Sequence, residues 1–312
     1  MIGFAAESFA EDIPGCAGPS RLREALVSAV QRLNCAGIET ARLDAEVLLG
    51  YVLAMTREQI LVSAEMLLDR AQLERYQELL QLRLAHAPVA YITGRQEFWS
   101  LDFQVTSRVL VPRADTERLV EIALMLKSSF SATCPLRILD IGTGSGAVAI
   151  SLASELPHAA FWATDVSQAG LEIARSNASR VGVAERISFI CADLFGPFAA
   201  ERDRFDLIVS NPPYIRSADI ANLAPEVSWW EPRIALDGGA DGLDFYRRLA
   251  AEASSNLIPG GAIAVEIGAD TSTQVSDLFV VAGYANVETF QDYAGKDRVV
   301  VAKNSKGVAS ET

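Results

Sequence analysis

Apolar residues recur with a helical period through residues 20–87. Between Ser20 and Gly37 they repeat every three or four positions and so share one helix face: Leu22, Ala25, Leu26, Ala29, Val30 and Leu33. Ser20 is a residue type that caps the start of a helix, and Gly37 is a type that ends one. Thr40 and Thr56 mark two further starts, so this part of the chain predicts a series of short helices.

A last helix of this region carries one apolar stripe: Leu73, Tyr76, Leu80 and Leu84. Pro88 ends it, because proline lacks the N–H that a continuing helix needs. The pattern therefore predicts a small helical bundle over residues 20–87. Periodicity alone favours a packing domain, with a substrate-docking module as the alternative.

The period changes after the bundle. Leu101, Phe103 and Val105 alternate with polar residues, and the apolar run 109–111 follows. Alternation of this kind is typical of a strand with one buried face. We expect a hairpin within residues 88–114 that links the bundle to the rest of the chain.

Strand and helix patterns alternate from about residue 115 onward. Strands are predicted at 136–141, 160–164, 186–191, 205–210 and 261–267, and helices at 116–127, 146–156, 168–181, 241–256 and 272–282. Such alternation indicates a parallel sheet that is covered on both faces. Two further strands, 285–290 and 297–302, have no helix between them and should pair antiparallel. The prediction for residues 115–303 is an α/β domain with a Rossmann-like, mostly parallel sheet.

Composition and charge restrict the chemistry. The chain has 312 residues, half of them hydrophobic, and a formal net charge of −13. The negative field repels phosphate backbones, which makes nucleic acid an improbable partner. The two histidines, His86 and His158, argue against a Ser-His-Asp engine and a histidine metal site. The cysteines are far apart in the sequence, which indicates free thiols and no metal centre: Cys16, Cys35, Cys134 and Cys191.

The chain ends carry no targeting pattern. Residues 1–20 contain three carboxylates and no Lys or Arg, whereas a signal peptide needs a cationic start. No apolar run approaches the roughly 18 residues that span a bilayer. We expect a cytoplasmic protein with flexible tails at residues 1–19 and 304–312.

A glycine-rich turn follows the strand predicted at 136–141. It comprises Gly142, Thr143, Gly144, Ser145 and Gly146. Glycines allow a tight turn and a close approach of a ligand to the backbone, and the N–H groups of the following helix face that ligand. Asp165 ends the next strand, where a carboxylate can accept hydrogen bonds from both ribose hydroxyls. Asp193 ends the third, where it can accept from the adenine amine while Leu194 packs on the ring.

The glycine spacing alone is compatible with two cofactors. Gly142, Gly144 and Ala147 also satisfy the dinucleotide fingerprint G-x-G-x-x-A, so NAD is an alternative to S-adenosylmethionine. Polar residues at the ends of three successive strands favour an adenosine-containing cofactor over a purely structural turn.

The segment Asn211-Pro212-Pro213-Tyr214 follows the fourth parallel strand. Two prolines stiffen the loop and leave carbonyl groups free to accept hydrogen bonds. Asn211 adds a side-chain carbonyl, and Tyr214 adds a flat aromatic face. Together they predict a slot for a planar –NH₂ group, which a methyltransferase needs and a dehydrogenase does not.

These two motifs resemble those of the amino-methyltransferases, and three more stretches narrow the likeness. They are residues 88–94 with Glu97-Phe98-Trp99, residues 111–117, and Glu231-Pro232 with Ala235-Leu236, Gly239 and Gly242-Leu243. The chain is similar over roughly residues 20–302 to the bacterial peptide chain release factor glutamine methyltransferases, which also begin with a helical domain.

This resemblance implies the fold of a class I S-adenosylmethionine-dependent methyltransferase. The implied substrate is the glutamine of the Gly-Gly-Gln loop in class 1 release factors. Because residues 20–87 form a separate helical domain joined by a hairpin beside the expected site, we predict that they recognise this partner. The resemblance further implies that residues 142–146, Asp165 and Leu194 contact S-adenosylmethionine and that residues 211–214 hold the glutamine. We expect Asn211, Pro212 and Tyr214 to act in catalysis, and Asn211 to lie beside the cofactor as well.

Two other functions compete with this hypothesis. Enzymes that methylate the exocyclic amine of adenine in DNA or RNA share Asn-Pro-Pro-Tyr, but they usually offer basic and stacking surfaces. Trp229 and Trp230 could stack a base, yet the chain is strongly acidic. A non-catalytic interaction module would have no need of both loops.

Overall fold

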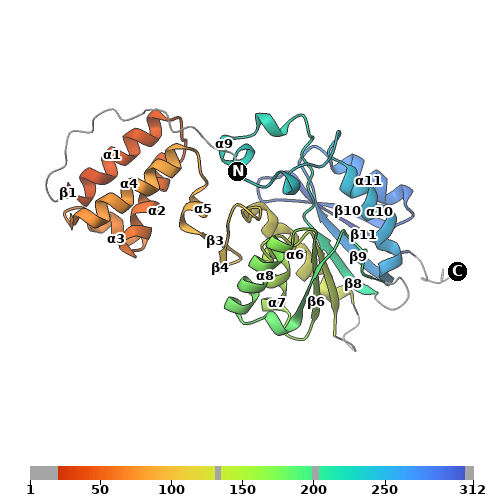
Figure 1. Ribbon diagram of the computed structural model, residues 1–312. Coiled ribbons are helices and arrows are strands. Elements are labelled where there is room, and N and C mark those ends of the chain that lie inside the picture. Colours follow the sequence, from red (N-terminus) through yellow and green to blue (C-terminus); the bar gives the residue numbers. More distant parts are fainter. Residues whose placement is uncertain (1–19, 131–134, 199–203, 306–312) are drawn as a thin grey trace. The chain divides into compact units, whose positions relative to one another are not determined.

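The computed structural model describes residues 20–130, 135–198 and 204–305. The chain forms two compact units that divide between Thr93 and Gly94 (Figure 1). The predicted tail at 1–19, Cys16, Cys134 and most of the predicted C-terminal tail lie outside the described residues.

The first unit is helical. Its helices are α1 (Leu22–Cys35), α2 (Ala41–Leu53), α3 (Arg57–Val62), α4 (Arg70–Leu84) and α5 (Val89–Thr93). Two-residue strands β1 (Ser20–Arg21) and β2 (Leu67–Leu68) pair antiparallel beside them. Apolar stripes from α1, α2 and α4 form a single core, as their period predicts.

Helix ends in this unit differ in part from the prediction. Thr56 caps α3 as expected, since its hydroxyl accepts from the Gln59 amide. Arg21, not Ser20, is the N-cap of α1, and Glu24 reaches back to its amide. Pro88 ends no helix directly but precedes α5, which the sequence did not predict, because proline fits the start of a helix as well as its end.

The second unit opens with the predicted hairpin. Strands β3 (Arg95–Phe98) and β4 (Leu101–Gln104) pair antiparallel. Phe98 and Phe103 are buried in the core of the unit. Asn177 of helix α8 (Gln168–Val181) accepts from the Gln104 amide at 2.7 Å and donates to its carbonyl at 3.0 Å. The hairpin is therefore packed into the second unit, whereas residues 88–93 of the expected linker belong to the first unit, and residues 105–113 follow the hairpin without a strand.

A seven-stranded sheet, counted over the described residues, organises the second unit in the order β10-β11-β9-β8-β5-β6-β7. The strands are β5 (Arg137–Ile141), β6 (Ala160–Asp165), β7 (Ile187–Cys191), β8 (Phe205–Ser210), β9 (Leu257–Glu266), β10 (Ala285–Gln291) and β11 (Asp297–Lys303). Strands β7, β6, β5, β8 and β9 are parallel, whereas β11 is antiparallel to both of its neighbours. This confirms the predicted sheet and the antiparallel pairing of its last two strands.

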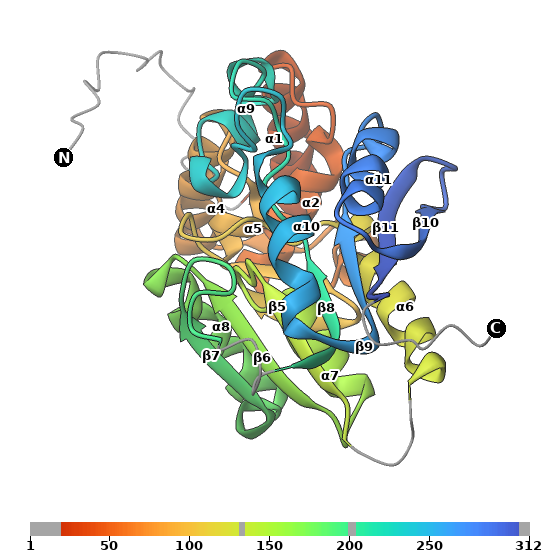
Figure 2. The same cartoon turned by 90° about the vertical axis from the view of Figure 1, so that its right-hand side faces the viewer.

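Helices cover both faces of the sheet. One face packs against α6 (Glu117–Leu126), α7 (Ala147–Glu155) and α8, and the other against α10 (Asp244–Asn256) and α11 (Ser272–Val281). Figure 2 shows α10 lying across the near face of the sheet. Alternate strand residues serve the two cores, as the period of two requires: Ile138 and Val209 face one, Leu139 and Ile208 the other.

Shorter elements complete the unit. They are the 3-10 turns η1 (Ala114–Thr116), η2 (Lys127–Ser129), η3 (Ala184–Arg186), η4 (Ile220–Asn222) and η5 (Arg233–Ala235), and helix α9 (Pro225–Ser228). The predicted start of the C-terminal tail, residue 304, is too early, because residue 304 is still packed in the unit. Asn304 is buried, and its side chain donates to the carbonyls of Ser254, Leu257 and Ile258.

Candidate active site

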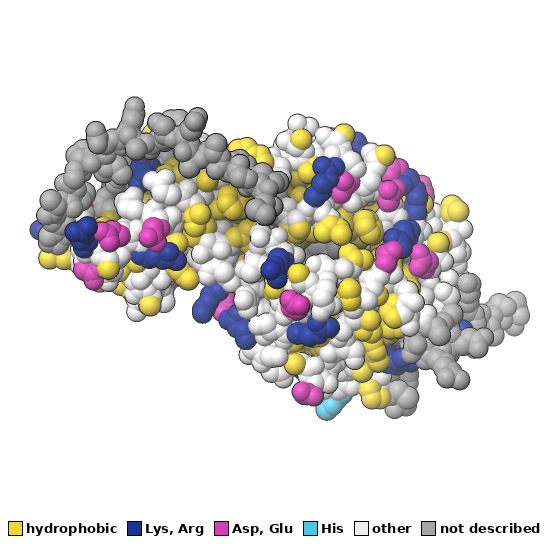
Figure 3. Space-filling model, in the orientation of Figure 1, with side chains coloured by type: hydrophobic (Ala, Val, Ile, Leu, Met, Phe, Trp, Pro, Cys, Tyr) yellow, Lys and Arg dark blue, Asp and Glu magenta, His cyan; other side chains and the backbone are white. Residues whose placement is uncertain are grey.

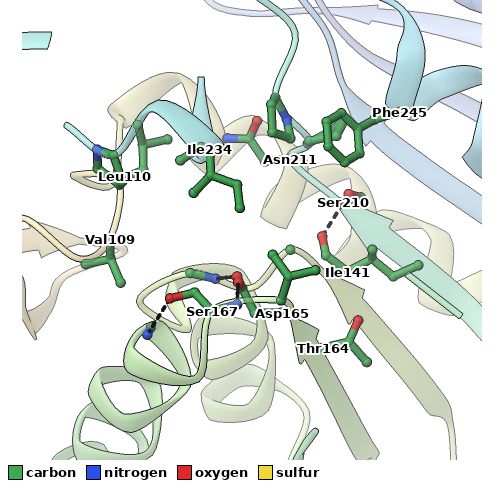
Figure 4. A pocket seen from close by; sticks show the side chains of 18 of the residues that line it. Val109, Leu110, Ile141, Thr164, Asp165, Ser167, Ser210, Asn211, Ile234 and Phe245 are labelled. Atoms are coloured by element: carbon green, nitrogen blue, oxygen red, sulfur yellow. Dashed lines mark hydrogen bonds between the residues drawn. The ribbon is translucent and has the colours of Figure 1, made fainter. Parts of the chain in front are cut away.

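A cavity opens where β7, β6, β5 and β8 end, at the point where the strand order reverses direction. Ligands bind at such switch points because the loops on either side diverge. The cavity encloses about 810 Å³, part of it open to solvent. Figure 4 shows Asp165 and Ser167 on one side, Asn211 and Phe245 on the opposite side, and Val109, Leu110 and Ile234 closing a third side.

The glycine-rich turn forms the floor. Gly142 and Gly144 line the cavity with φ of 72° and 55°, a region that favours glycine. A Cβ at either position would meet no other atom within 4 Å, so the space that a side chain would fill is open to a ligand. A Cβ at Gly146, in contrast, would lie 2.6 Å from Ile150 Cδ1. Gly146 therefore allows close helix packing.

The other residues of the turn do not face the cavity and instead pack inside the protein. Thr143 and Ser145 are buried, and neither they nor Gly146 line the cavity. The Thr143 hydroxyl donates to Asp140 at 2.7 Å, and the Gly146 amide donates to the Thr143 carbonyl at 2.8 Å. Burial raises the pKa of Asp140 to about 7, opposed by the hydrogen bonds from Thr143 and the Ala149 amide. A direct cofactor contact by residues 143, 145 and 146 stays a prediction.

Asp165 ties the floor to the next strand. One carboxylate oxygen accepts from the Gly144 amide and the other from the Ser167 amide, each at 2.8 Å. A carboxylate has about four lone-pair sites, so capacity remains for two donors on the cavity side. Burial raises the pKa of Asp165, and the two amides oppose that rise. Binding of a ribose by this carboxylate stays a prediction.

Asp193 and Leu194 follow β7 and also line the cavity. Asp193 is more than half exposed and accepts from Arg248 of α10 at 2.9 Å. Leu194 is buried and adopts the left-handed conformation, with φ of 47°. That conformation turns the chain sharply as it leaves the strand.

The loop after β8 forms the opposite wall. Asn211, Pro212 and Pro213 line the cavity, and Ser210 anchors the loop by donating to the Ile141 carbonyl at 2.8 Å. The Asn211 side-chain nitrogen donates to Thr116 Oγ1 at 3.1 Å. Its amide oxygen remains available to accept.

Tyr214 does not line the cavity. Its ring lies beside Gly268, where a Cβ would meet Tyr214 Cδ2 at 3.5 Å. Burial raises the pKa of its hydroxyl to about 12, so the phenol is neutral. The expected stacking of this ring on the acceptor stays a prediction.

A second glycine segment holds the backbone of the acceptor loop. A Cβ at Gly238 would lie 2.8 Å from the Pro213 carbonyl oxygen and from Tyr214 Cα. A Cβ at Gly242 would lie 2.5 Å from the Tyr214 carbonyl oxygen. Only glycine permits this approach, which explains Gly242 among the glycines that the sequence singled out; Gly238 was not among them.

Two further loops supply walls of the cavity. Residues 108–110 come from one loop, and Pro232, Ile234 and Ala235 from the other. Arg113 joins the loops through an ion pair with the buried Glu231 at 2.6 Å. Burial raises the pKa of Glu231, and Arg113 opposes that rise. Residues 108–110 had no signal of a site in the sequence, whereas Pro232 and Ala235 belong to the stretches that carry the family resemblance, although no residue type there points to a ligand.

This arrangement could bind an adenosine-containing cofactor from which a group is transferred to an acceptor. It offers an open glycine floor, a carboxylate with spare acceptor capacity and apolar walls. No group of three or more potential metal ligands occurs in the described ranges. Within the same ranges, none of the helices combines the length and apolar character needed to cross a membrane.

Comparisons with known proteins identify the family of the chain. A family model described as "PrmC N-terminal domain" matches residues 24–94, and one described as "Methyltransferase small domain" matches residues 121–226. The chain is 46% identical to the release factor glutamine methyltransferase of Moorella thermoacetica, over 90% of this chain and 98% of the relative. It is 44% identical to the enzyme of that name from Bradyrhizobium diazoefficiens, over 87% and 91%.

Solved structures show the same fold at low identity. The hMettl16 catalytic domain, in complex with an RNA hairpin, matches with a TM-score of 0.54 and 15% identity, over 77% of this chain and 82% of that one. This likeness supports the class I methyltransferase fold and nothing finer. The extended sequence identity goes further: the chain belongs to the release factor glutamine methyltransferase family.

Proposed function

We propose that this S-adenosylmethionine-dependent enzyme methylates the side-chain amide nitrogen of the glutamine in the Gly-Gly-Gln motif of class 1 release factors. The observation that carries the proposal is the slot after β8, where the Asn211 amide oxygen is available beside the rigid Pro212-Pro213 backbone. The names of relatives that match 87–90% of the chain support the same substrate.

The cofactor fits the floor of the cavity. S-adenosylmethionine, when bound, supplies an electrophilic methyl group on a positively charged sulfonium. Asp165 would accept from the ribose hydroxyls with its two remaining acceptor sites. Leu194 would pack on the adenine ring, and Asp193, held by Arg248, would accept from the adenine amine.

The acceptor is the difficult partner in this reaction, because an amide nitrogen shares its lone pair with its carbonyl. Asn211 Oδ1 and the Pro212 carbonyl would accept its two N–H bonds and hold the nitrogen in line for transfer, which lowers the barrier through positioning. As the nitrogen forms its new bond it becomes positive, and its N–H groups become stronger donors. Both acceptors therefore bind the transition state better than the ground state.

The protein needs no general base before transfer. The nitrogen becomes strongly acidic only once the methyl group has moved, and its proton can then pass to solvent. Pro213 and Tyr214 keep the slot rigid, since the glycine segment 238–242 packs against their backbone. The helical unit is the proposed recognition domain for the release factor.

Methylation of a nucleobase amine is the second candidate, and the surface does not favour it. On the face drawn in Figure 3, the Lys and Arg side chains of the described residues are interspersed with Asp and Glu. A protein that tracks a phosphate backbone would gather its basic side chains along one path.

A labelled-cofactor assay tests the proposal. Wild-type enzyme is incubated with a release factor, with the same factor carrying alanine for the Gly-Gly-Gln glutamine, and with DNA and RNA. We expect label in the unaltered release factor alone, and Asn211→Ala should lower kcat by about 10²–10³ while leaving cofactor affinity nearly unchanged. Label in nucleic acid, equal label in the altered factor, or full turnover by Asn211→Ala would each contradict the slot.

A further inference from the structure

Glu266 lies behind the acceptor slot, at the end of β9. It is only 2% exposed, and its Oε2 atom is fully buried without a hydrogen-bond partner. Burying a carboxyl group is costly unless it is hydrogen-bonded or paired with an opposite charge. The function described so far gives this group no role.

The side chains beside Glu266 include Asn211, which is part of the acceptor slot. The Thr116 hydroxyl and the Asn211 amide lie close enough to the Glu266 carboxyl for each to lower its pKa by favouring the charged form. Asn211 Nδ2 also donates to Thr116 Oγ1 at 3.1 Å. Three side chains from η1, the loop after β8 and the end of β9 therefore form one connected group.

The direction of these bonds follows from what each group can donate. An ionised carboxylate only accepts, so the Thr116 hydroxyl must give it the single proton it has. Thr116 Oγ1 is then left to accept from Asn211. Both constraints require the –NH₂ end of the Asn211 amide to face Thr116 and Glu266, which turns its oxygen the other way.

We propose that Thr116 and Glu266 are positioning residues that fix the orientation of the Asn211 amide, so that its oxygen faces the acceptor nitrogen. This inference rests on the proposed function of the slot. An amide group is nearly symmetric in shape, so packing alone holds either orientation equally well. In the reversed orientation the –NH₂ group would face the N–H of the substrate, and the acceptor would be lost.

Charged and titratable groups surround Glu266 from each side. Arg298 of β11 contacts Asp115 at 3.0 Å and Asp292 at 3.1 Å. Tyr246 of α10 donates to the Glu266 main-chain carbonyl at 2.8 Å, and Tyr214 lies close enough to be affected by its charge. Burial raises the pKa of Glu266 to about 7, while Thr116, Arg298 and Asn211 oppose the rise and Asp115 adds to it. The carboxylate form, which only accepts, therefore becomes dominant as pH rises through about 7.

Four variants test the inference: Thr116→Val, Thr116→Ser, Glu266→Met and Glu266→Gln. Single-turnover methylation of a release factor is measured from pH 6 to 8.5 at saturating cofactor, together with cofactor affinity and thermal unfolding. Thr116→Val and Glu266→Met remove the acceptors that orient Asn211, so each should slow transfer by about tenfold or more with cofactor affinity unchanged. Thr116→Ser keeps the hydroxyl and should restore the rate.

The pH profile separates orientation from simple packing. The wild-type rate should rise as pH passes about 7, the pKa to which burial raises Glu266. Glu266→Gln keeps one acceptor at every pH and should show no such rise, with a constant rate near the low-pH value of wild type. Rates of Thr116→Val and Glu266→Met within twofold of wild type would overturn the inference, as would the same rise in Glu266→Gln.

Asn211→Ala in the same assay distinguishes the two proposals. If wild type is active, Asn211→Ala is slow and Thr116→Val matches wild type, the positioning role fails and the slot survives. If wild type does not methylate the release factor, the proposed function itself fails. Thr116→Val removes no buried charge, so it keeps the test decisive even if Glu266→Met does not fold.

Discussion

Replacing Asp165 by alanine should weaken the binding of S-adenosylmethionine without unfolding the protein. Each oxygen of this carboxylate accepts one backbone amide, from Gly144 and from Ser167, and each has one further acceptor site toward the cavity. Asp165→Ala therefore removes the proposed ribose contacts and also releases Gly144, which forms part of the floor.

The size of the effect follows from the number of lost contacts. One hydrogen bond to a charged group contributes about 1.5–3 kcal/mol. Water replaces part of that loss, so we count a single bond and expect the dissociation constant to rise about ten- to hundredfold. Because burial raises the pKa of Asp165, wild-type affinity should also fall as the pH is lowered through that pKa.

Isothermal titration calorimetry measures this directly. Asp206→Ala is the matched control, because Asp206 also accepts a backbone amide, from Arg137 at 2.8 Å, but lies at the start of β8 and away from the cavity. It should bind the cofactor like wild type. Unchanged affinity in a folded Asp165→Ala protein, or an equal loss in the control, would refute the ribose assignment.

Three further perturbations follow from the structure. The folded pKa of Asp140 is raised from 3.8 to about 7, so its contribution to stability is present at acidic pH and is lost as pH rises through about 7. Urea denaturation gives the free energy of unfolding of wild type and of Asp140→Asn, and the difference between the two proteins should fall by at most about 4 kcal/mol from pH 4 to pH 8. The same difference at both pH values would contradict this prediction. Gly238→Ala should lower kcat at least about tenfold with little change in cofactor affinity, because its Cβ would press on the Pro213 carbonyl and Tyr214 Cα at 2.8 Å; steady-state kinetics showing wild-type kcat would exclude this. A chain that begins at Gly94, shown to be folded by circular dichroism, should bind cofactor normally but fail to methylate release factor; full methylation would remove the recognition role from the helical unit.

Much of the fold could be predicted because the period of apolar residues reports which face is buried. The strands after Arg137 alternate between two cores, so their positions were predicted to within a few residues. Pro88 was misread because proline is compatible with both ends of a helix. The segment 105–113 contains buried apolar residues and lines the cavity at residues 108–110, yet it forms no strand, because buried apolar residues also occur in packed loops.

The part of the site that lies at the strand ends could be predicted, because short sequence motifs mark these positions. Gly142, Gly144, Asp165 and Asn211 line one cavity because they lie at or just after the carboxyl ends of parallel strands, and neighbouring parallel strands end at the same edge. Contacts between distant segments had no such signal. Thr116 and Asn211 are far apart in the sequence and lie side by side only in the folded chain.

The most direct test of the account is the location of the transferred methyl group. A release factor is incubated with the enzyme and S-adenosylmethionine, digested, and its peptides are sequenced by tandem mass spectrometry. The account predicts one methyl group, on the side-chain amide nitrogen of the Gly-Gly-Gln glutamine, and none when Asn211→Ala replaces wild type for the same short time. A methyl group on another residue, or an unmodified glutamine beside methylated nucleic acid, would contradict it.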